Sequence, residues 1–282
     1  MVFPGRLLGI FNLSPKKHMG QNFLVDPSTA EMIVRRAGVA SDETVLEIGA
    51  GLGALTIPLA RAANKLYAVE KDRDLLGVLA DTLRENELDT VELIGSNIFD
   101  VDPYSLVSAA GGRLTVFGNL PYNISSQVVI WAIENREVIE RAVFMFQKEV
   151  ARRIAAPPGS SDYGRLSVMV QYCSRVKRVA AIGARQFYPR PKVDSEVIEI
   201  YFDPAIGPAA ESEALFGAVV KAAFGRRRKT IKNAMSPSAI GVDGRAVECM
   251  WRHCDIDSSR RAETLTVREF VRLADTLWRC IG

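Results

Sequence analysis

One stretch decides the fold of this 282-residue chain: Thr44-Val45-Leu46-Glu47-Ile48-Gly49-Ala50-Gly51-Leu52-Gly53. Its first half is short and mostly apolar, which indicates a buried strand. The glycines that follow let the backbone approach a ligand closely, and an apolar pattern with helical spacing comes next. A strand, a glycine turn and a helix in this order place free amides of the helix start beside a bound ligand.

The spacing of the glycine turn narrows the choice of ligand. A dinucleotide site takes Gly-x-Gly-x-x-Gly, whereas this turn reads Gly-x-Gly-x-Gly. Glu47 precedes it, and its charge would repel a pyrophosphate but suit a ligand with a positive methionyl ammonium and sulfonium. A second strand over 65–69 ends at Glu70, whose carboxylate could accept both hydroxyls of a ribose. We therefore expect a cationic, adenosine-type cofactor, with Gly49 and Gly51 close to it.

A second motif, Asn119-Leu120-Pro121-Tyr122, follows the apolar run 114–117. An exocyclic base amine becomes nucleophilic when acceptors draw its hydrogens out of the ring plane, and the Asn119 Oδ1 atom and the Leu120 carbonyl could be those acceptors. Pro121 fixes the backbone, and Tyr122 offers a face on which an unstacked base can rest. Asn-x-Pro after a strand is also a common turn. Its place after the glycine turn and Glu70 favours a nucleobase-amine site.

With these motifs the chain resembles the S-adenosylmethionine-dependent adenine N6-dimethyltransferases that act on small-subunit (16S-type) ribosomal RNA. Five segments carry the resemblance in family order: Gly20 to Asp26 (GQNFLVD), Glu47 to Thr56, Asn119 to Ser126 (NLPYNISS), Phe187 to Ser195 (FYPRPKVDS) and Phe224 to Asn233 (FGRRRKTIKN). The resemblance implies that S-adenosyl-L-methionine is the cofactor and that the small ribosomal subunit is the partner. It also implies dimethylation of two adjacent adenines during ribosome assembly.

The resemblance also assigns residues. It implies that Asn22 and Leu24 close over the cofactor, that Gly49 lies beside its methionyl part and Glu70 holds its ribose, and that Asn119 touches both cofactor and target amine. One position departs from the family pattern. Ser96 stands where the family has an Asp that contacts the cofactor's adenine amino group. Because hydrogen bonds to a charged acceptor are stronger than neutral ones, we expect weaker cofactor binding here.

The target RNA has its own candidate residues. Phe187 precedes two prolines in a loop, where an aromatic side chain has few structural reasons to be, so we expect it to be a second stacking wall for the adenine. The net charge of +3 is too small to indicate nucleic-acid binding by itself. Its distribution is more informative, because basic side chains that contact phosphates position an RNA without reading it. The expected phosphate contacts are Lys16, Lys17, Arg190, Lys192, Arg226, Arg227, Arg228 and Lys229.

The pattern along the chain predicts an α/β fold. Strands are expected near 44–48, 65–70, 91–95, 114–118 and 141–147, separated by helices, which indicates a Rossmann-like, doubly wound, mostly parallel sheet. Two later runs, 166–182 and 193–202, are expected to form an antiparallel edge. We expect a flexible lead-in over 1–20, a methyltransferase domain over 21–203 and a small all-helical RNA-binding domain over 204–282.

Composition excludes several classes of protein. No stretch of 18 apolar residues is free of charge, so no membrane span is expected. Cys173, Cys249, Cys254 and Cys280 show no C-x-x-C pairing, and the reduced thiols of a cytoplasmic enzyme explain them best. His253-Cys254 is a weak metal candidate because the only other histidine, His18, is far away in sequence. We expect no metal and a monomer.

Three other functions share part of this pattern. A DNA methylase has a similar glycine turn and an Asn/Asp-Pro-Pro-Tyr motif, but normally a larger target-recognition domain. A large-subunit ribosomal RNA methylase of the antibiotic-resistance type is closer, with the same fold. A non-catalytic assembly or transcription factor could keep the fold and bind nucleic acid. The sequences of the motifs at 119–126 and 187–195 favour the small-subunit enzyme. The intact Glu70 and Asn119 count against a loss of catalysis.

Overall fold

The computed structural model describes residues 3–121, 123–203, 205–206, 209–226 and 228–281. The chain forms two compact units. The first consists of Met1–Ala151 and Val176–Phe202, and the second of Arg152–Arg175 and Asp203–Gly282. A division at residue 203 was expected from the sequence, but residues 152–175, which were expected in the first domain, belong to the second unit.

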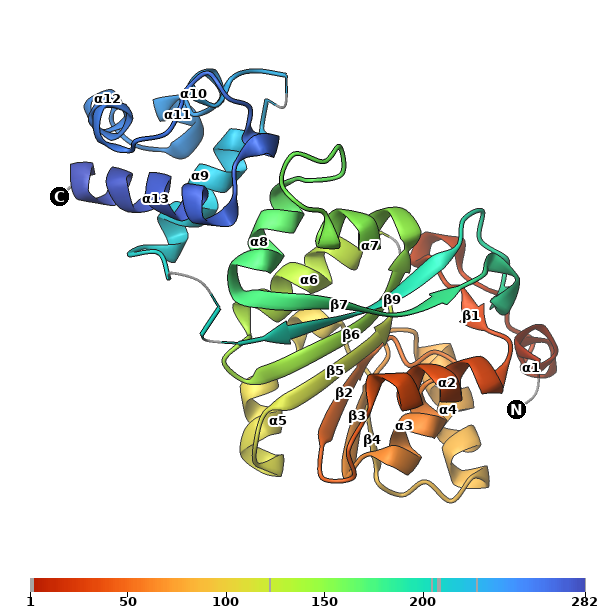
Figure 1. Ribbon diagram of the computed structural model, residues 1–282. Helices are drawn as coiled ribbons and strands as arrows, with labels where there is room; N and C mark the ends of the chain where they lie inside the picture. The colour runs from red at the N-terminus through yellow and green to blue at the C-terminus, as the bar shows by residue number, and fades with distance from the viewer. Residues whose placement is uncertain (1–2, 122, 204, 207–208, 227, 282) are drawn as a thin grey trace. The chain divides into compact units, whose positions relative to one another are not determined.

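The described residues build a seven-stranded sheet with the order β4-β3-β2-β5-β6-β9-β7 (Figure 1). The pairs β4/β3, β3/β2, β2/β5 and β5/β6 are parallel, and β6/β9 is antiparallel. This confirms the predicted doubly wound sheet with an antiparallel edge. The strands are β2 Thr44–Ile48, β3 Lys65–Val69, β4 Val91–Ile94, β5 Leu114–Asn119, β6 Ile139–Gln147, β7 Ser174–Ile182 and β9 Ser195–Phe202.

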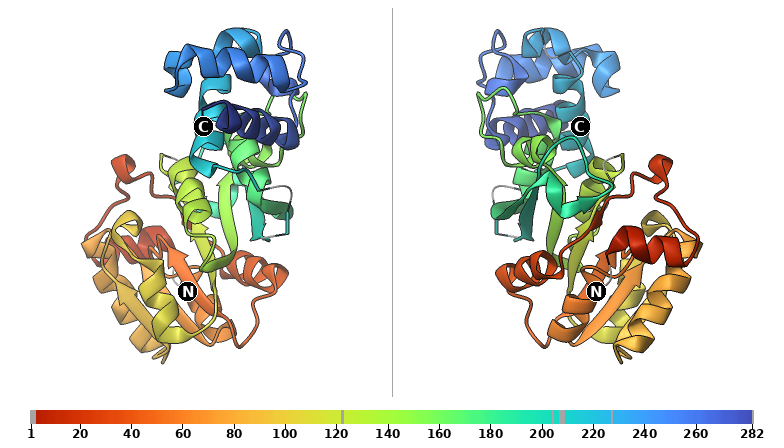
Figure 2. Two further views of the ribbon diagram at one scale, coloured as in Figure 1. Left: turned by 90° about the vertical axis from the view of Figure 1, so that its left-hand side faces the viewer. Right: turned by 90° about the vertical axis from the view of Figure 1, so that its right-hand side faces the viewer.

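Helices cover both faces of the sheet (Figures 1 and 2). The strand order reverses between β2 and β5, so right-handed connections place α3 and α4 on one face and α5 and α6 on the other. Ligands of such sheets bind at the carboxyl ends of the strands where the order reverses. The helices of the first unit are α2 Pro27–Ala37, α3 Thr56–Ala62, α4 Arg73–Glu85, α5 Pro103–Ala110 and α6 Ser125–Glu134, and helix α7, Lys148–Ala155, begins in the first unit and ends in the second.

Residues 3–20 of the N-terminal segment, for which a flexible lead-in was expected, contain two helical stretches. Residues Pro4–Ile10 form helix α1, and Lys17–Met19 form a short 3-10 helix. Leu8 is 2% exposed and packs in one apolar cluster with Phe23, Leu52, Leu75 and Val78. The mildly apolar start of the chain therefore folds because it has a hydrophobic surface of the first unit to cover.

A small two-stranded sheet joins this segment to the loop after β7. Strand β1, Phe23–Leu24, pairs antiparallel with β8, Phe187–Tyr188, in the register Phe23 to Tyr188 and Leu24 to Phe187. Two segments far apart in sequence are thus held side by side. Both belong to motifs that carry the family resemblance.

The run 166–182 was expected to be a strand of the antiparallel edge, but it is not one continuous strand. It consists of helix α8, Arg165–Cys173, followed by β7. The amide of Gly164 donates to Ser167 Oγ at 3.0 Å, which caps the start of α8. A continuous apolar run does not distinguish a buried helix from a buried strand. The predicted edge itself is confirmed, because β7 and β9 are neighbours in the sheet.

The described part of the second unit is mainly helical, as predicted. A capping box begins the last helix, because the Thr266 amide donates to Glu269 Oε2 at 2.7 Å and the Glu269 amide donates to Thr266 Oγ1 at 3.3 Å. This reciprocal pair satisfies two free donors where α13 begins. Besides α8, the helices are α9 Glu213–Phe224, α10 Ile231–Ala234, α11 Pro237–Ile240, α12 Gly244–His253 and α13 Val267–Ile281.

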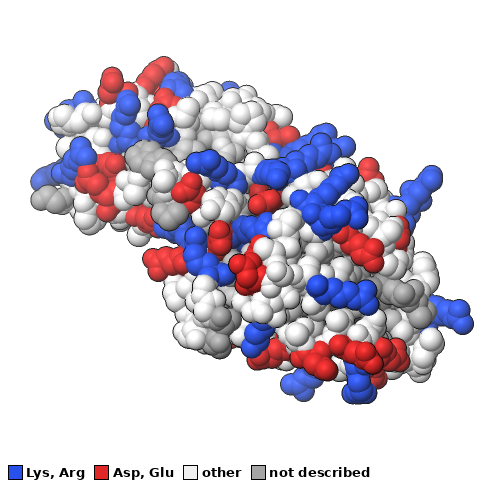
Figure 3. All heavy atoms as spheres, turned by 60° about the horizontal axis from the view of Figure 1, so that its bottom comes forward, with Lys and Arg blue, Asp and Glu red and all other residues white. Residues whose placement is uncertain are grey.

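Basic and acidic side chains are mixed on the surface drawn in Figure 3. On the face drawn in Figure 3, Lys and Arg side chains lie among Asp and Glu side chains. Such mixing agrees with the close balance of 36 basic and 33 acidic residues. Of the described helices, none combines the length and the apolar character that a membrane span requires.

Candidate active site

A cavity of about 540 Å³ opens in the first unit at the carboxyl ends of β2, β3 and β5. This is the end of the sheet where the strand order reverses, so the cavity lies where such folds bind their ligands. Most of its wall comes from the segments 18–24, 47–52, 69–71, 96–99 and 119–121. It therefore brings together Asn22, Leu24, Glu47, Gly49, Gly51, Glu70, Ser96, Asn119, Leu120 and Pro121, which the sequence singled out.

The glycine turn forms one side of this cavity. Gly49 and Gly51 have φ angles of 74° and 58°, which side chains other than glycine rarely adopt. A Cβ atom at Gly51 would also lie 3.3 Å from the Phe23 ring. The turn is tied to β3 because the Gly49 amide donates to the Val69 carbonyl at 2.9 Å.

Glu70 lies at the end of β3 with both carboxylate oxygens fixed. Oε2 accepts from the Gly51 amide at 2.9 Å, and Oε1 accepts from the Asp72 amide at 2.8 Å. Burial raises the pKa of Glu70, although these two amides act in the opposite direction. The carboxylate is thus held at the cavity wall with lone pairs left for two hydroxyl donors.

Glu47 is the most deeply buried acid of the site. It is 1% exposed, and its Oε2 atom has no hydrogen-bond partner among the described residues. Burial raises its pKa to about 8, and the charge of Glu70 adds to this rise while the Thr56 side chain opposes it. Glu47 is therefore mostly protonated at neutral pH. This differs from the charged acid expected from the sequence, because strand β2 is fully enclosed.

Asn119 ends β5 beside the glycine turn. On one side β5 pairs with β2, where Ile48 lies opposite Gly118, and on the other side Asn119 lies opposite Met145 of β6. A Cβ atom at Gly118 would lie 3.1 Å from the Ile48 carbonyl, so the glycine permits this close approach. The Asn119 Nδ2 atom donates to the Asn22 carbonyl at 2.9 Å. Since the amide nitrogen is occupied by this bond, Oδ1 is the acceptor that the side chain keeps for a ligand.

Comparison with known proteins agrees with this arrangement. Residues 12–278 match the family model described as ribosomal RNA adenine dimethylase. The chain belongs to this family. It is 48% identical to the ribosomal RNA small subunit methyltransferase A of Desulforapulum autotrophicum, over 100% of this chain and 99% of that protein. It is 40% identical to the protein of the same name from Magnetococcus marinus, over 96% and 94%.

Solved structures support the fold of this dimethylase-family chain. A dimethyladenosine transferase from Plasmodium falciparum superposes with a TM-score of 0.73 at 23% identity, covering 89% of this chain and 95% of that chain. The 23S rRNA methyltransferase ErmE superposes with a TM-score of 0.64 at 27% identity, covering 90% and 99%.

A polar network holds the N-terminal segment of this dimethylase-family chain at the cavity. Lys16 Nζ lies 2.7 Å from Asp72 Oδ1 and 2.8 Å from Asp74 Oδ2. Gln21 Nε2 donates to Asp72 Oδ2 at 2.8 Å, while Gln21 Oε1 accepts from the Lys16 amide at 2.8 Å. One residue further along, the Asn22 carbonyl accepts from Asn119. Asp72 therefore anchors the segment that positions the Asn119 carboxamide.

This network changes the reading of Lys16 and adds residues that the sequence analysis missed. Lys16 was expected to contact RNA phosphates, but its ammonium group is already paired with two carboxylates. Gln21 and Asp72 were not singled out. Asp72 was visible in the sequence only as a helix cap, since its side chain accepts from the Asp74 amide where α4 begins.

Phe187 does not occupy the position expected of a stacking wall. It is 4% exposed and belongs to the apolar core cluster that contains Leu24 and Val197. Its pairing with Leu24 across β1 and β8 explains why an aromatic side chain sits in this loop. The loop thus supplies a core residue in this structure, and the stacking role of Phe187 stays a prediction. Tyr122 and Arg227 lie outside the described residues.

The wall near Ser96 contains two further side chains that the sequence analysis missed. Ser96 is half-buried, and its Oγ atom donates to the Asn97 carbonyl at 3.3 Å. Ile98 is buried and Phe99 is 39% exposed, and both line the cavity. The signal for them is Asn97, which accepts from the Phe99 amide at 3.4 Å and so begins a 3-10 helix after β4.

The remaining basic candidates are solvent-exposed. Arg190 and Lys192 lie in the loop between β8 and β9, and Lys17 lies on the N-terminal segment. In the second unit, Arg226, Arg228 and Lys229 follow α9 and are exposed. No ion pair links any of these six side chains to another described residue. Their charges are therefore available to an anionic partner.

Proposed function

We propose that this chain transfers methyl groups from S-adenosyl-L-methionine to the N6 amine of adenines in small-subunit ribosomal RNA. The observation that carries the proposal is the Asn119 carboxamide at the edge of the cavity, with its nitrogen occupied by Asn22 and its oxygen left as an acceptor. The names of the relatives from Desulforapulum autotrophicum and Magnetococcus marinus support the substrate. Dimethylation of two adjacent adenines during ribosome assembly is part of this proposal.

The residues of the cavity fit the cofactor. Glu70 presents a fixed carboxylate to the ribose hydroxyls, and Ser96, with Ile98 and Phe99, suits the adenine. The unpartnered Oε2 atom of Glu47 suits the positively charged methionyl end beside Gly49. When bound, the cofactor supplies an electrophilic methyl group on a sulfonium.

The protein contributes orientation and acceptors to the reaction. We assign the Asn119 Oδ1 atom and the Leu120 carbonyl as acceptors for the two hydrogens of the adenine amine. Pro121 fixes the direction of that carbonyl, and Tyr122 is proposed to stack on the base. Because 119–121 contains no histidine or carboxylate, the product amine loses its proton to water. Orientation of the amine toward the methyl group then provides most of the acceleration.

The exposed cations suit phosphate contacts that hold a folded RNA by its shape. We assign this role to Lys17, Arg190, Lys192, Arg226, Arg228 and Lys229, together with Arg227. In this proposal the first unit carries the methyltransferase site, and the second, helical unit binds RNA. A monomer acting in the cytoplasm on the small subunit completes the proposal.

A second candidate is methylation of large-subunit ribosomal RNA. It is favoured by the likeness to the 23S rRNA methyltransferase ErmE. Incubation of each purified subunit with methyl-labelled cofactor distinguishes the two candidates, since our proposal expects label in small-subunit adenines alone. Label in the large subunit alone would favour the second candidate.

Replacement of Asn119 by Ala tests the residue assignment. We expect methyl transfer to fall about 100-fold or more, as when a donor or acceptor acting at the transition state is lost. Cofactor affinity should fall only about fivefold, because one hydrogen bond to the N-terminal segment is removed. Asn135→Ala is the matched control, since Asn135 Nδ2 also donates to a backbone carbonyl, that of Trp131. A parent-like rate in Asn119→Ala would refute the assignment.

A further inference from the structure

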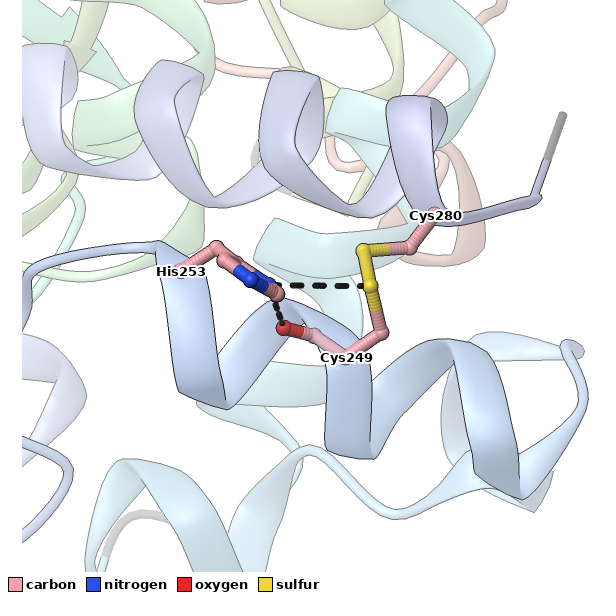
Figure 4. A group of neighbouring side chains, drawn as sticks. All are labelled: Cys249, His253 and Cys280. Carbon is pink, nitrogen blue, oxygen red and sulfur yellow. Dashed lines mark hydrogen bonds between the residues drawn. A yellow bond between two sulfur atoms is a disulfide. The ribbon is translucent and has the colours of Figure 1, made fainter.

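Three potential metal ligands converge in the second unit, which contains none of the residues proposed to bind the cofactor or the target adenine. Cys249 and His253 lie one turn apart on α12, and Cys280 lies near the end of α13 (Figure 4). Cys249 and Cys280 form a disulfide between residues 31 positions apart. The reduced thiols expected from the sequence are thus wrong for this pair, while Cys173 and Cys254 are free and buried.

We propose that reduction of this disulfide creates a binding site for Zn²⁺ made of Cys249, His253 and Cys280. The disulfide is then the oxidised, metal-free form of the site. Two thiolates and one imidazole form a donor set that binds zinc in preference to harder cations. The i, i+4 spacing on α12 places the Cys249 and His253 side chains on one helix face, and Figure 4 shows the imidazole beside the two sulfur atoms.

The distances suit one small ion. The candidate ligand atoms all lie within 4.8 Å of one another. His253 Nδ1 lies 3.8 Å from Cys249 Sγ. A tetrahedral zinc ion with Zn–S of about 2.3 Å and Zn–N of about 2.0 Å requires roughly 3.5 Å between nitrogen and sulfur and about 3.8 Å between the sulfurs. The Cα atoms of the two cysteines are 6.0 Å apart, so side-chain rotation can separate the sulfurs after reduction.

The imidazole must change its hydrogen bond to become a ligand. His253 Nδ1 lies 2.9 Å from the Cys249 carbonyl oxygen, and a proton on Nδ1 satisfies that contact. Coordination through Nδ1 requires its lone pair, so in the metal-bound form the proton is on Nε2 and the carbonyl contact is lost. The two cysteines are half-buried and His253 is exposed. Water can therefore reach the fourth position of the ion.

The chemistry needs only a dithiol reductant. The dithiol gives two electrons and two protons to the Cys249–Cys280 bond, which yields two thiols, and the reductant becomes a cyclic disulfide. Zn²⁺ then displaces both thiol protons, so the two thiolates and the neutral imidazole form a site of zero net charge with the ion. Either form of the site cross-links α12 and α13.

The test measures zinc binding in the two redox states. Protein treated with a dithiol and then freed of reductant and metal is titrated with Zn²⁺ against a chromogenic chelator. We expect one ion per chain for the reduced protein and none for the oxidised protein. Intact mass verifies the two states, because the reduced chain is heavier by two hydrogen atoms.

Variants show whether these three residues form the site. Cys249→Ser and Cys280→Ser should each abolish stoichiometric binding, and His253→Ala should weaken it at least tenfold. Cys173→Ala is the matched control, because it removes a thiol outside the triad, and it should bind like the parent. Circular dichroism establishes that each variant is folded. Reduced parent that binds no zinc, or His253→Ala that binds as tightly as the parent, would overturn the proposal.

Discussion

Replacement of Glu47 by Gln should change how the stability of this protein depends on pH. The pKa of Glu47 is raised from 4.5 to about 8 in the folded protein by burial. Between these two values the folded chain holds a proton that the unfolded chain has lost, so the free energy of unfolding decreases as pH rises through this window. At about 1.4 kcal/mol per pKa unit, the full effect is on the order of 5 kcal/mol.

Gln has nearly the same shape and carries no ionisable proton, so Glu47→Gln should remove this decrease. Urea unfolding of parent and variant at several pH values between 5 and 8.5 measures the difference. The raised pKa of Glu70 acts in the same direction. Because Glu70 is present in both proteins, its effect cancels when the profile of the variant is subtracted from that of the parent. Glu31→Gln is the control, because Glu31 is exposed. Parallel pH profiles for parent and Glu47→Gln would refute the reasoning.

The same carboxyl links cofactor binding to protons. At pH 7, a group with a pKa near 8 is protonated in about nine of ten molecules. A cationic ligand beside Glu47 favours the carboxylate, so S-adenosylmethionine should release close to one proton per site at pH 7. Calorimetry in two buffers with different ionisation enthalpies measures this release. The Glu47→Gln variant should show none, and an equal release in both proteins would contradict the assignment of Glu47 to the cofactor.

Three further predictions concern the cofactor segment and the RNA. Asp72→Asn should raise the dissociation constant of the cofactor about tenfold by releasing Lys16 and Gln21, as direct binding would show; Asp81→Asn, which removes an exposed pair with Arg84, should have no such effect. Ser96→Asp should tighten cofactor binding about fivefold in calorimetry, because a charged acceptor strengthens the hydrogen bond, and an unchanged affinity would reject that account. Charge reversal of both Arg226 and Arg228 should weaken RNA binding and reduce the slope of log affinity against log salt by roughly 0.7–0.9 for each lost phosphate contact; an unchanged slope would make these arginines part of a solvated surface.

The local sequence determined the part of the site that is formed by residues at the ends of the strands. The strand 44–48, the glycine turn and Glu70 are specified by residues close together in the chain, since a short apolar run, a turn conformation and a helix start are local properties. The carboxyl ends of neighbouring parallel strands meet at one edge, so Asn119 could be placed beside the turn from strand order alone. The sequence also specified the capping box of α13, because its two hydrogen bonds join residues three positions apart.

Tertiary structure decided the roles of residues whose partners are distant in the chain. Lys16 is paired with Asp72, and Phe187 is buried against Leu24, although each side chain alone suggested contact with RNA. Cys249 and Cys280 meet because α12 and α13 pack together, while their spacing carried no pairing signal. Glu47 keeps its proton because neighbouring strands and helices exclude water around β2. Burial and long-range pairing depend on the whole chain being folded, and no local pattern encodes them.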